Sequence, residues 1–485
     1  MLCQLFSASL LFASGPADAE HAAAIDLILD RAFSQAAPVD SKDFSPSPTI
    51  DRLLERAISQ NLIAGGVAVI GNRDGILSTT ARGRLNAGAG SPLIGERTIF
   101  DLASLTKVIA TTPAVMKLLD EGRIGLLDPL SRWFPEFAAS GQEQITILNL
   151  LTHTSGLDDI TVGTEQSMEC AVRKAAAEKY RQRPGSHFHY ADLNFILLGE
   201  LVRRVSGETL DAFCRQQIYG PLGTSATMFL PSRDLSVSIA PTSGAECGIV
   251  QDPNARRLGG VAGHAGLFST AHDLSRYARM ILGGGVIDNR RILSERVVTQ
   301  MTSPYFYNNG AVTRGLGWDM ESPFSAPKGS FFSQASFGHT GYSGSSIWID
   351  PQQDLFVILL TNRVNYRDTK SFNQLRRDVS TVAAANFKLP GDDQGLAPPW
   401  EVARINEGLL RDSTRPAQVP RRAVKLASRS HQKWQHQQHA HRRTMRLERL
   451  MARGSRSHHA TRTARAEASK TSHPSKKRRG PGRRA

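Results

Sequence analysis

The sequence predicts an α+β fold, in which an antiparallel sheet flanked by helices is joined to a helical lobe and followed by a disordered basic tail. Two hairpin-like segments stand far apart in the chain, mostly helical segments separate them, and basic residues crowd the last part. The 485 residues allow two or three domains or one large two-lobed domain. With 40% apolar and 21% charged residues, the composition is ordinary for a globular protein and excludes a fibrous or wholly disordered chain.

Two segments precede the predicted domain. Residues 1–19 hold a short apolar run that ends in Ala-Asp-Ala, which is typical of a secretory signal, although no Lys or Arg precedes Arg31. We therefore expect a periplasmic or secreted protein, with a cytoplasmic location as the alternative. Residues 20–48 are expected to form a short helix and a linker rich in Pro and Ser. No apolar run reaches the roughly 18 residues of an integral membrane span.

The first hairpin follows a helix. Apolar residues at helical spacing predict a helix over residues 50–58, and two β-type runs after it, 66–70 and 76–81, flank an Asn-Arg-Asp-Gly turn. A second hairpin joins residues 346–349 to 355–360 through Asp-Pro-Gln-Gln. The two hairpins come from opposite ends of the domain and are expected to form one sheet. The helices between the hairpins are then expected to form a second lobe, with a cleft where the two lobes meet.

Helical segments are predicted at residues 104–121, 191–205 and 270–282, and the last one stops at three consecutive glycines. We expect the whole domain to span residues 49–390. Beyond it, residues 391–485 contain few apolar side chains and are expected to be disordered.

The net charge of +15 is concentrated in this tail. Residues 420–485 carry 20 Lys and Arg against two acidic residues, which leaves 39 Lys and Arg against 42 acidic residues elsewhere. The domain is therefore nearly neutral, and the tail is a candidate for binding polyanions. One alternative for the whole chain is accordingly a non-catalytic polyanion-binding protein.

Several site types lack support in the sequence. The four cysteines form no Cys-x-x-Cys pair, which excludes a disulfide scaffold and the usual zinc spacings. The chain also has no GxSxG, GxxxxGK[ST], HExxH or complete GxGxxG motif. We expect neither a metal site nor an organic cofactor.

One pair of residues, Ser104 and Lys107, has a spacing that suits catalysis. Ser104 and Lys107 stand three residues apart at the start of a helical segment, so their side chains share one face. A serine hydroxyl needs a neighbouring base to act as a nucleophile, and a desolvated lysine can serve as that base. The same spacing at Ser325 is interrupted by Pro327, and the one at Ser430 lies in the basic tail.

Four segments together resemble the penicillin-binding and class C β-lactamase-like serine hydrolases. Residues 98–107 (TIFDLASLTK) resemble the nucleophile segment of that family, and residues 150–157 (LLTHTSGL) resemble a loop between helices. Residues 188–194 (FHYADLN) resemble its Tyr-x-Asn element, and residues 339–342 (HTGY) resemble its Lys-Thr-Gly strand. The resemblance covers about residues 46–390, occurs in the family's order, and implies the fold of that family.

The resemblance implies catalytic roles. Ser104 would be the nucleophile, and Tyr190 would move the proton between nucleophile, leaving group and water, with Lys107 beside it. Either Lys107 or Tyr190 could be the general base. The backbone N–H groups of Ser104 and Tyr342 would form the oxyanion hole.

The sequence departs from the family pattern at two positions. Asp192 stands where the family often has Asn, and His339 stands where the penicillin-recognising members have Lys. The site is therefore less cationic by up to about two charges, which argues against an efficient β-lactamase or D-Ala-D-Ala carboxypeptidase, whose substrates carry a carboxylate. Alternatively, Asp192 could pair with Lys107, keep it protonated and leave Tyr190 as the base.

Residues 250–255 (VQDPNA) and 259–268 (GGVAGHAGLF) are similar to a subgroup that includes secreted amidases of N-acetylmuramoyl-L-alanine. His264 and His153 are interpreted as hydrogen-bonding loop residues rather than metal ligands. The substrate-binding residues that the resemblance implies are Asp192, His339, Thr340, Gly341 and His264. We expect a serine hydrolase that cleaves an amide or ester through an acyl-enzyme on Ser104, with a small-molecule or muropeptide substrate. Carboxylesterase and D,D-peptidase activities are the alternatives within the fold.

Overall fold

The computed structural model describes residues 46–86, 88, 90–140, 142–163, 167–242, 246–308, 312–387 and 405. The signal-like segment at 1–19, the predicted short helix and most of the linker at 20–48, and all but one residue of the predicted tail at 391–485 lie outside the described residues.

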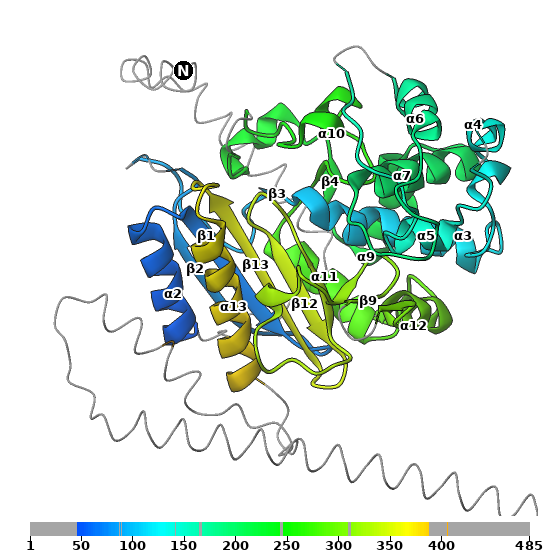
Figure 1. The fold of residues 1–485 in the computed structure, drawn as a ribbon. Coiled ribbons are helices and arrows are strands. Elements are labelled where there is room, and N and C mark those ends of the chain that lie inside the picture. The colour runs from blue at the N-terminus through cyan, green and yellow to red at the C-terminus, as the bar shows by residue number, and fades with distance from the viewer. Residues whose placement is uncertain are drawn as a thin grey trace, which may run out of the picture. The chain divides into compact units, whose positions relative to one another are not determined.

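In the described part of the chain, eight strands form one antiparallel sheet in the order β2-β1-β13-β12-β11-β10-β9-β8 (Figure 1). Their bounds are β1 (Ile63–Gly71), β2 (Ile76–Gly83), β8 (Phe306–Asn308), β9 (Val312–Arg314), β10 (Asp319–Glu321), β11 (Phe337–Thr340), β12 (Ser346–Asp350) and β13 (Leu355–Arg363). Strand β1 pairs with β13, with Val67 opposite Leu360. The two predicted hairpins therefore lie side by side, and the predicted α+β class with an antiparallel sheet is confirmed.

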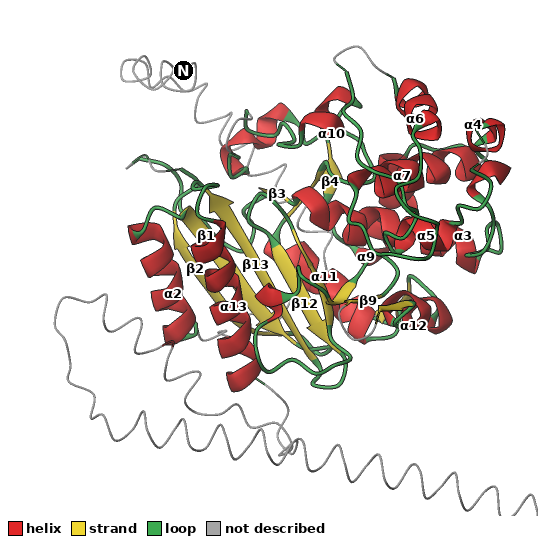
Figure 2. Cartoon of the chain, viewed as in Figure 1, coloured by secondary structure: helices red, strands yellow, loops and turns green. Residues whose placement is uncertain are grey.

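Two helices from opposite ends of the domain cover one face of the sheet, α2 (Pro48–Ser59) and α13 (Thr369–Asn386) (Figure 2). Strand β1 is buried on both faces: Ala68 and Ile70 pack with these helices, whereas Val67 and Val69 pack into the main core on the other side. Helix α2 begins at Pro48, earlier than predicted, because proline suits the first helical turn.

Ile405 belongs to the same apolar layer as α2 and α13, and its side chain is only 5% exposed. This residue falls inside the range 391–485 that we expected to be a disordered tail. Ile405 therefore packs against the domain, and the other residues of that range lie outside the described part of the chain.

The remaining helices are mostly those of the lobe between the hairpins. Their bounds are α3 (Thr112–Asp120), α4 (Pro135–Ala139), α5 (Ile147–Leu151), α6 (Met168–Ala177), α7 (Asp192–Ser206), α8 (Leu210–Cys214), α9 (Gly220–Leu222), α10 (Pro253–Arg257), α11 (Ala271–Leu282) and α12 (Glu295–Thr302). Helix α11 packs against β1 and β13, so it covers the second face of the sheet. None of the helices in the described residues has the length and hydrophobicity of a membrane span.

Short strands complete the fold. Three of them, β3 (Phe100–Asp101), β5 (Leu267–Ser269) and β4 (Met228–Phe229), form a small sheet in that order, and β6 (Val286–Ile287) pairs with β7 (Arg290–Arg291). Because β3 leads directly into the Ser104 segment, its pairing with β5 fixes where that segment starts.

The predicted helix at residues 104–121 is irregular. It begins with a 3₁₀ turn, η2 (Ala103–Leu105), continues as a π-helical turn, η3 (Lys107–Thr111), and becomes an α-helix only at α3. Within the π turn, the Thr111 hydroxyl donates a hydrogen bond to the Gly263 carbonyl. Turns of this kind are frequent at functional sites, and this one places Lys107 beside Ser104.

Candidate active site

Ser104 lies on a strained turn. Ala103 before it has a φ of +47°, in the left-handed region that is unfavourable for a residue with a Cβ. The Asp101 carboxylate holds this turn, because its Oδ1 accepts a hydrogen bond from the Ala103 N–H at 2.8 Å. The other oxygen, Oδ2, accepts one from the Gln251 N–H at 2.7 Å, which ties the turn to the segment after β4.

The Lys107 ammonium is fully buried beside the serine. Its Nζ donates hydrogen bonds to Ser104 Oγ at 3.0 Å and to the His264 carbonyl at 3.1 Å, and it lies 2.7 Å from Oδ1 of Asp192. Burial favours the neutral amine, but the Asp192 charge and the Tyr190 side chain outweigh it and raise the pKa of Lys107 above its ordinary value. The lysine is therefore an ammonium at neutral pH.

Asp192 is the counterion of this ammonium. It is the first residue of α7, where the helix dipole favours a negative charge. Burial opposes ionisation, but the charges of Lys107 and His264 prevail and lower the pKa of Asp192. Of the two arrangements that the sequence left open, the structure has the ion pair between Asp192 and Lys107.

Tyr190 is a second neighbour of the lysine. Lys107 Nζ lies 5.2 Å from the centroid of the Tyr190 ring, and the ring stacks on His153 with centroids 4.5 Å apart. His153 is buried, and its Nδ1 accepts a hydrogen bond from the Ala191 N–H. Burial, followed by the charges of Arg314 and Lys107, holds the pKa of His153 well below its usual range. A neutral imidazole therefore stacks on Tyr190. The hydrogen bond of His153 agrees with the interpretation of His153 as a hydrogen-bonding loop residue.

Strand β11 also borders the site, because it packs against η2, the turn that carries Ser104. It contains His339, which is buried, and Thr340, which is half-buried; Gly341 and Tyr342 follow, and Tyr342 is 56% exposed. The His339 and Tyr190 ring centroids are 6.1 Å apart. Burial first, and then the charges of Arg314 and Lys107, hold the pKa of His339 well below its usual range, so this imidazole is neutral.

His264 is also in contact with the lysine. Its backbone carbonyl accepts from Lys107, and its buried ring lies with Nε2 2.9 Å from Oδ1 of Asp252. Burial raises the pKa of Asp252, but the hydrogen bond and charge of His264 outweigh it and lower that pKa to about 2. Sequence reasoning missed Asp252, although the Asp-Pro pair marked a helix start: Asp252 caps α10 by accepting from the Ala255 N–H.

Asp192, Asp252 and His264 thus converge, with their ligand-type atoms within 4.8 Å of one another. The sequence predicted no metal ligand at His264, because no acidic residue stood at a customary spacing. In the structure, the Lys107 ammonium lies beside Asp192, where it supplies positive charge to the cluster. The four side chains form one charged network around the nucleophile.

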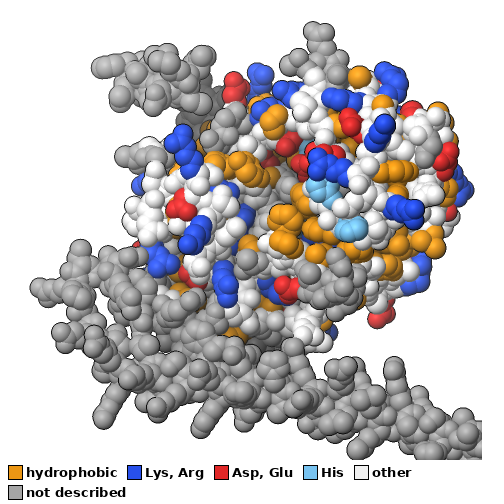
Figure 3. All heavy atoms as spheres, in the orientation of Figure 1, with side chains coloured by type: hydrophobic (Ala, Val, Ile, Leu, Met, Phe, Trp, Pro, Cys, Tyr) orange, Lys and Arg blue, Asp and Glu red, His pale blue; other side chains and the backbone are white. Residues whose placement is uncertain are grey.

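A further residue near Tyr190 was not anticipated. Phe324 follows β10, is 49% exposed, and its ring centroid lies 5.4 Å from that of Tyr190 and 6.2 Å from that of Phe188. Figure 3 shows hydrophobic side chains gathered around histidines in the middle of the face that it displays. An exposed aromatic ring beside the candidate proton carrier can contact a substrate.

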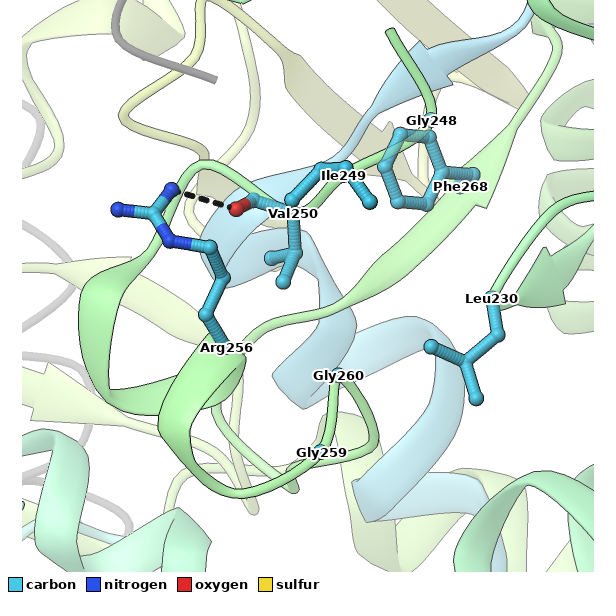
Figure 4. A pocket seen from close by; sticks show the side chains of 8 residues that line it. All are labelled: Leu230, Gly248, Ile249, Val250, Arg256, Gly259, Gly260 and Phe268. Atoms are coloured by element: carbon cyan, nitrogen blue, oxygen red, sulfur yellow. Dashed lines mark hydrogen bonds between the residues drawn. The ribbon is translucent and has the colours of Figure 1, made fainter. Parts of the chain in front are cut away.

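The structure also contains an apolar cavity of about 300 Å³ (Figure 4). Leu230, Ile249, Val250 and Phe268 line it, together with glycines of the 259–260 pair. Arg256 borders it and donates a hydrogen bond to the Val250 carbonyl at 2.8 Å. Val250, Gly259, Gly260 and Phe268 belong to the segments that the sequence singled out as similar to the amidases, and the other four lining residues do not. Ser104 is not among the lining residues.

The fold and the clustered Ser104, Lys107 and Tyr190 define a serine hydrolase of the penicillin-binding and β-lactamase type. Solved structures with this fold include EstCE1, a hydrolase with promiscuous acyltransferase activity, at 22% identity and a TM-score of 0.58, covering 73% of this chain and 99% of that one. A penicillin-binding protein homologue from Caulobacter crescentus has 19% identity and a TM-score of 0.58, with coverage of 70% and 98%.

The chain belongs to the Beta-lactamase family, whose model matches residues 50–380. A relative from Salmonella agona, named "Putative D-alanyl-D-alanine carboxypeptidase", is 30% identical over 310 residues. That alignment covers 56% of this chain and 71% of the relative. The resemblance drawn from four short segments of the sequence is thereby confirmed at the level of the family.

Proposed function

We propose that this hydrolase cleaves an amide or ester through an acyl-enzyme on Ser104. The observation that carries the proposal is the 3.0 Å hydrogen bond from Lys107 Nζ to Ser104 Oγ on the strained turn after β3. Ser104 Oγ attacks the carbonyl carbon while Tyr190, as the general base, takes its proton. The N–H groups of Ser104 and Tyr342 stabilise the resulting oxyanion.

The leaving group then departs with the proton that Tyr190 holds, and the acyl group stays on Ser104. Water attacks the ester, gives its proton to Tyr190 and displaces Ser104, which regains a proton as the acid is released. In this scheme Lys107 keeps its charge throughout, and its ammonium lies beside Tyr190 and orients Ser104 Oγ. The ion pair with Asp192 supports this division of roles over a neutral lysine base.

The substrate that we propose is an amide of the muropeptide type. A free substrate carboxylate needs a cationic partner, but His339 is neutral and Lys107 is paired with Asp192. The internal amide between muramic acid and L-alanine leaves no carboxylate at the scissile bond. Such a substrate also agrees with the predicted periplasmic or secreted location.

D,D-peptidase activity is the second candidate, favoured by the name of the Salmonella agona relative. Hydrolysis of a muramoyl peptide, a peptide ending in D-Ala-D-Ala and a short nitrophenyl ester would rank amidase, peptidase and esterase. Turnover of the ester alone would end the amidase proposal.

Labelling with a fluorophosphonate, followed by peptide mass spectrometry, tests the nucleophile. The label is expected on Ser104 in the native chain and should be absent from Ser104→Ala. A label that persists in the variant would remove Ser104 from its proposed role.

We also propose that the basic tail binds polyanions independently of catalysis. Deletion of residues 420–485 should then leave hydrolysis unchanged and abolish salt-sensitive binding to a polyanion such as heparin. Hydrolysis lost together with the tail would contradict an accessory role.

A further inference from the structure

The two chain segments that carry the proposed oxyanion donors are joined by a pair of buried serine hydroxyls. Ser343 Oγ donates a hydrogen bond to the Asp101 carbonyl at 2.6 Å, and Ser345 Oγ donates one to the Leu102 carbonyl at 2.8 Å. Asp101 and Leu102 directly precede the turn of Ser104, whereas the serines follow Tyr342. The hydroxyls therefore connect the backbone on both sides of the hole.

The turn between β11 and β12 is closed and pressed against the nucleophile segment. The Gly341 N–H donates to the Ser345 carbonyl at 2.8 Å, and the Gly344 N–H donates to the Gly341 carbonyl at 3.2 Å. A Cβ on Gly341 would lie 2.3 Å from the Leu102 carbonyl oxygen and 2.1 Å from Ser345 Oγ. Only glycine permits this approach, so the separation of the two segments is set by direct contact.

Arg376 of α13 also binds this turn. Its guanidinium is buried, donates hydrogen bonds to the carbonyls of Gly341 and Ser345, and lies 4.6 Å from the centroid of the Phe372 ring. A charged donor to two carbonyls is stronger than a neutral one and more directional, because the guanidinium is planar. The helix thereby anchors both ends of the turn that bears Tyr342.

We propose that Ser343, Ser345 and Arg376 are positioning residues that set the distance between the N–H groups of Ser104 and Tyr342. The inference rests on the proposed acyl-enzyme mechanism, since an oxyanion hole acts only where negative charge develops. Donors displaced from that position lose stabilisation of the transition state and little binding of the ground state. The residues thus affect kcat and leave KM largely unchanged.

The test is the rate at which a fluorophosphonate modifies Ser104, because the phosphoryl oxygen gains negative charge in the same hole and no substrate need be known. The double variant Ser343→Ala/Ser345→Ala should be modified roughly ten- to hundredfold more slowly than the native chain. Arg376→Met should show a similar loss, and Arg376→Lys, which keeps the charge, should recover part of it. With a cleavable ester, kcat should fall by the same factor while KM changes less than about twofold.

Ser336→Ala is the matched control. Ser336 is also buried, directly precedes β11, and its hydroxyl donates to the Ser333 carbonyl at 2.6 Å. This variant should lose a comparable amount of stability to urea but keep the native modification rate. Equal rates in the double variant and the native chain, or equal losses in the double variant and Ser336→Ala, would overturn the proposal. A native chain that is not modified at Ser104 would overturn the proposed function and this inference with it.

Discussion

Lys107 and Asp192 form an ion pair, with Nζ 2.7 Å from Oδ1, inside the site where the sequence suggested a lysine base. A lysine that acts as a base must lose its proton, and a carboxylate at this distance keeps the proton in place. The pair therefore supports the proposal that Lys107 keeps its charge while Tyr190 moves the protons.

Replacing Asp192 by Asn should reveal this assignment in the pH profile. Without the carboxylate, burial lowers the pKa of Lys107, so the lysine loses its charge at a lower pH than in the native chain. We expect the ratio of the kcat of Asp192→Asn to that of the native chain to fall as pH rises through the lowered pKa of Lys107. A ratio that rises with pH would instead identify the neutral Lys107 amine as the base. Asp120→Asn, which removes a carboxylate from Ser294 and Arg296, is the control.

Asp101 should make stability depend on pH. Burial, against the opposing hydrogen bonds from Gln251 and Ala103, raises its pKa from 3.8 to about 6. A carboxyl whose pKa is raised by folding stabilises the fold below the unfolded value, and this contribution is lost as pH rises through about 6. From pH 4 to pH 7 the native chain should lose roughly 2 kcal/mol relative to Asp101→Asn in urea unfolding. Parallel stability curves would contradict this, since all other titrating groups are common to both proteins.

Gly263 should tolerate no side chain. A Cβ there would lie 2.0 Å from the Phe195 carbonyl oxygen and 2.9 Å from the Gly199 nitrogen, and both of these residues belong to α7. We expect Gly263→Ala to destabilise the protein by several kcal/mol, about what other severe core substitutions cost. Gly95→Ala is the control, because a Cβ there meets nothing within 4 Å. Similar unfolding midpoints for the two variants would show that the loop moves away freely.

Phe324 should contribute to substrate binding. Its exposed ring next to Tyr190 can pack against an apolar or sugar face of the substrate, so Phe324→Ala should raise KM for a muramoyl peptide roughly three- to tenfold. Phe324→Tyr should retain the native KM. Leu127→Ala, at a residue that is 75% exposed, should change neither KM nor kcat. An unchanged KM in Phe324→Ala would show that the substrate does not contact this ring.

Local signals predicted the sheet and most helices. The turns at 72–75 and 350–353 and the β-type runs beside them indicated both hairpins, and α11 ends at the glycines that follow it. The segment after Ser104 was predicted as one regular helix, since apolar spacing does not distinguish 3₁₀, π and α turns. Its geometry depends on contacts such as that of Thr111 with Gly263, which is far away in the sequence.

The site was predictable only where its residues are close in sequence or follow a family motif. The spacing of Ser104 and Lys107 predicts their contact, and the motif around Tyr190 suggested its place. Asp252 and Arg376 gave no comparable signal. Asp252 binds His264 across a loop, and Arg376 binds the Ser345 carbonyl in the turn after β11. Both contacts therefore depend on the completed fold.

The pairing of β1 with β13 has a consequence for synthesis on the ribosome. Paired residues such as Val67 and Leu360 are separated by about 290 residues, so the middle of the sheet cannot close until nearly the whole domain has emerged. The helical lobe is made after β1 and before β13, so it can condense early, whereas β1 waits with an open edge. A chaperone that shields such an edge would therefore act on the first hairpin of the nascent chain.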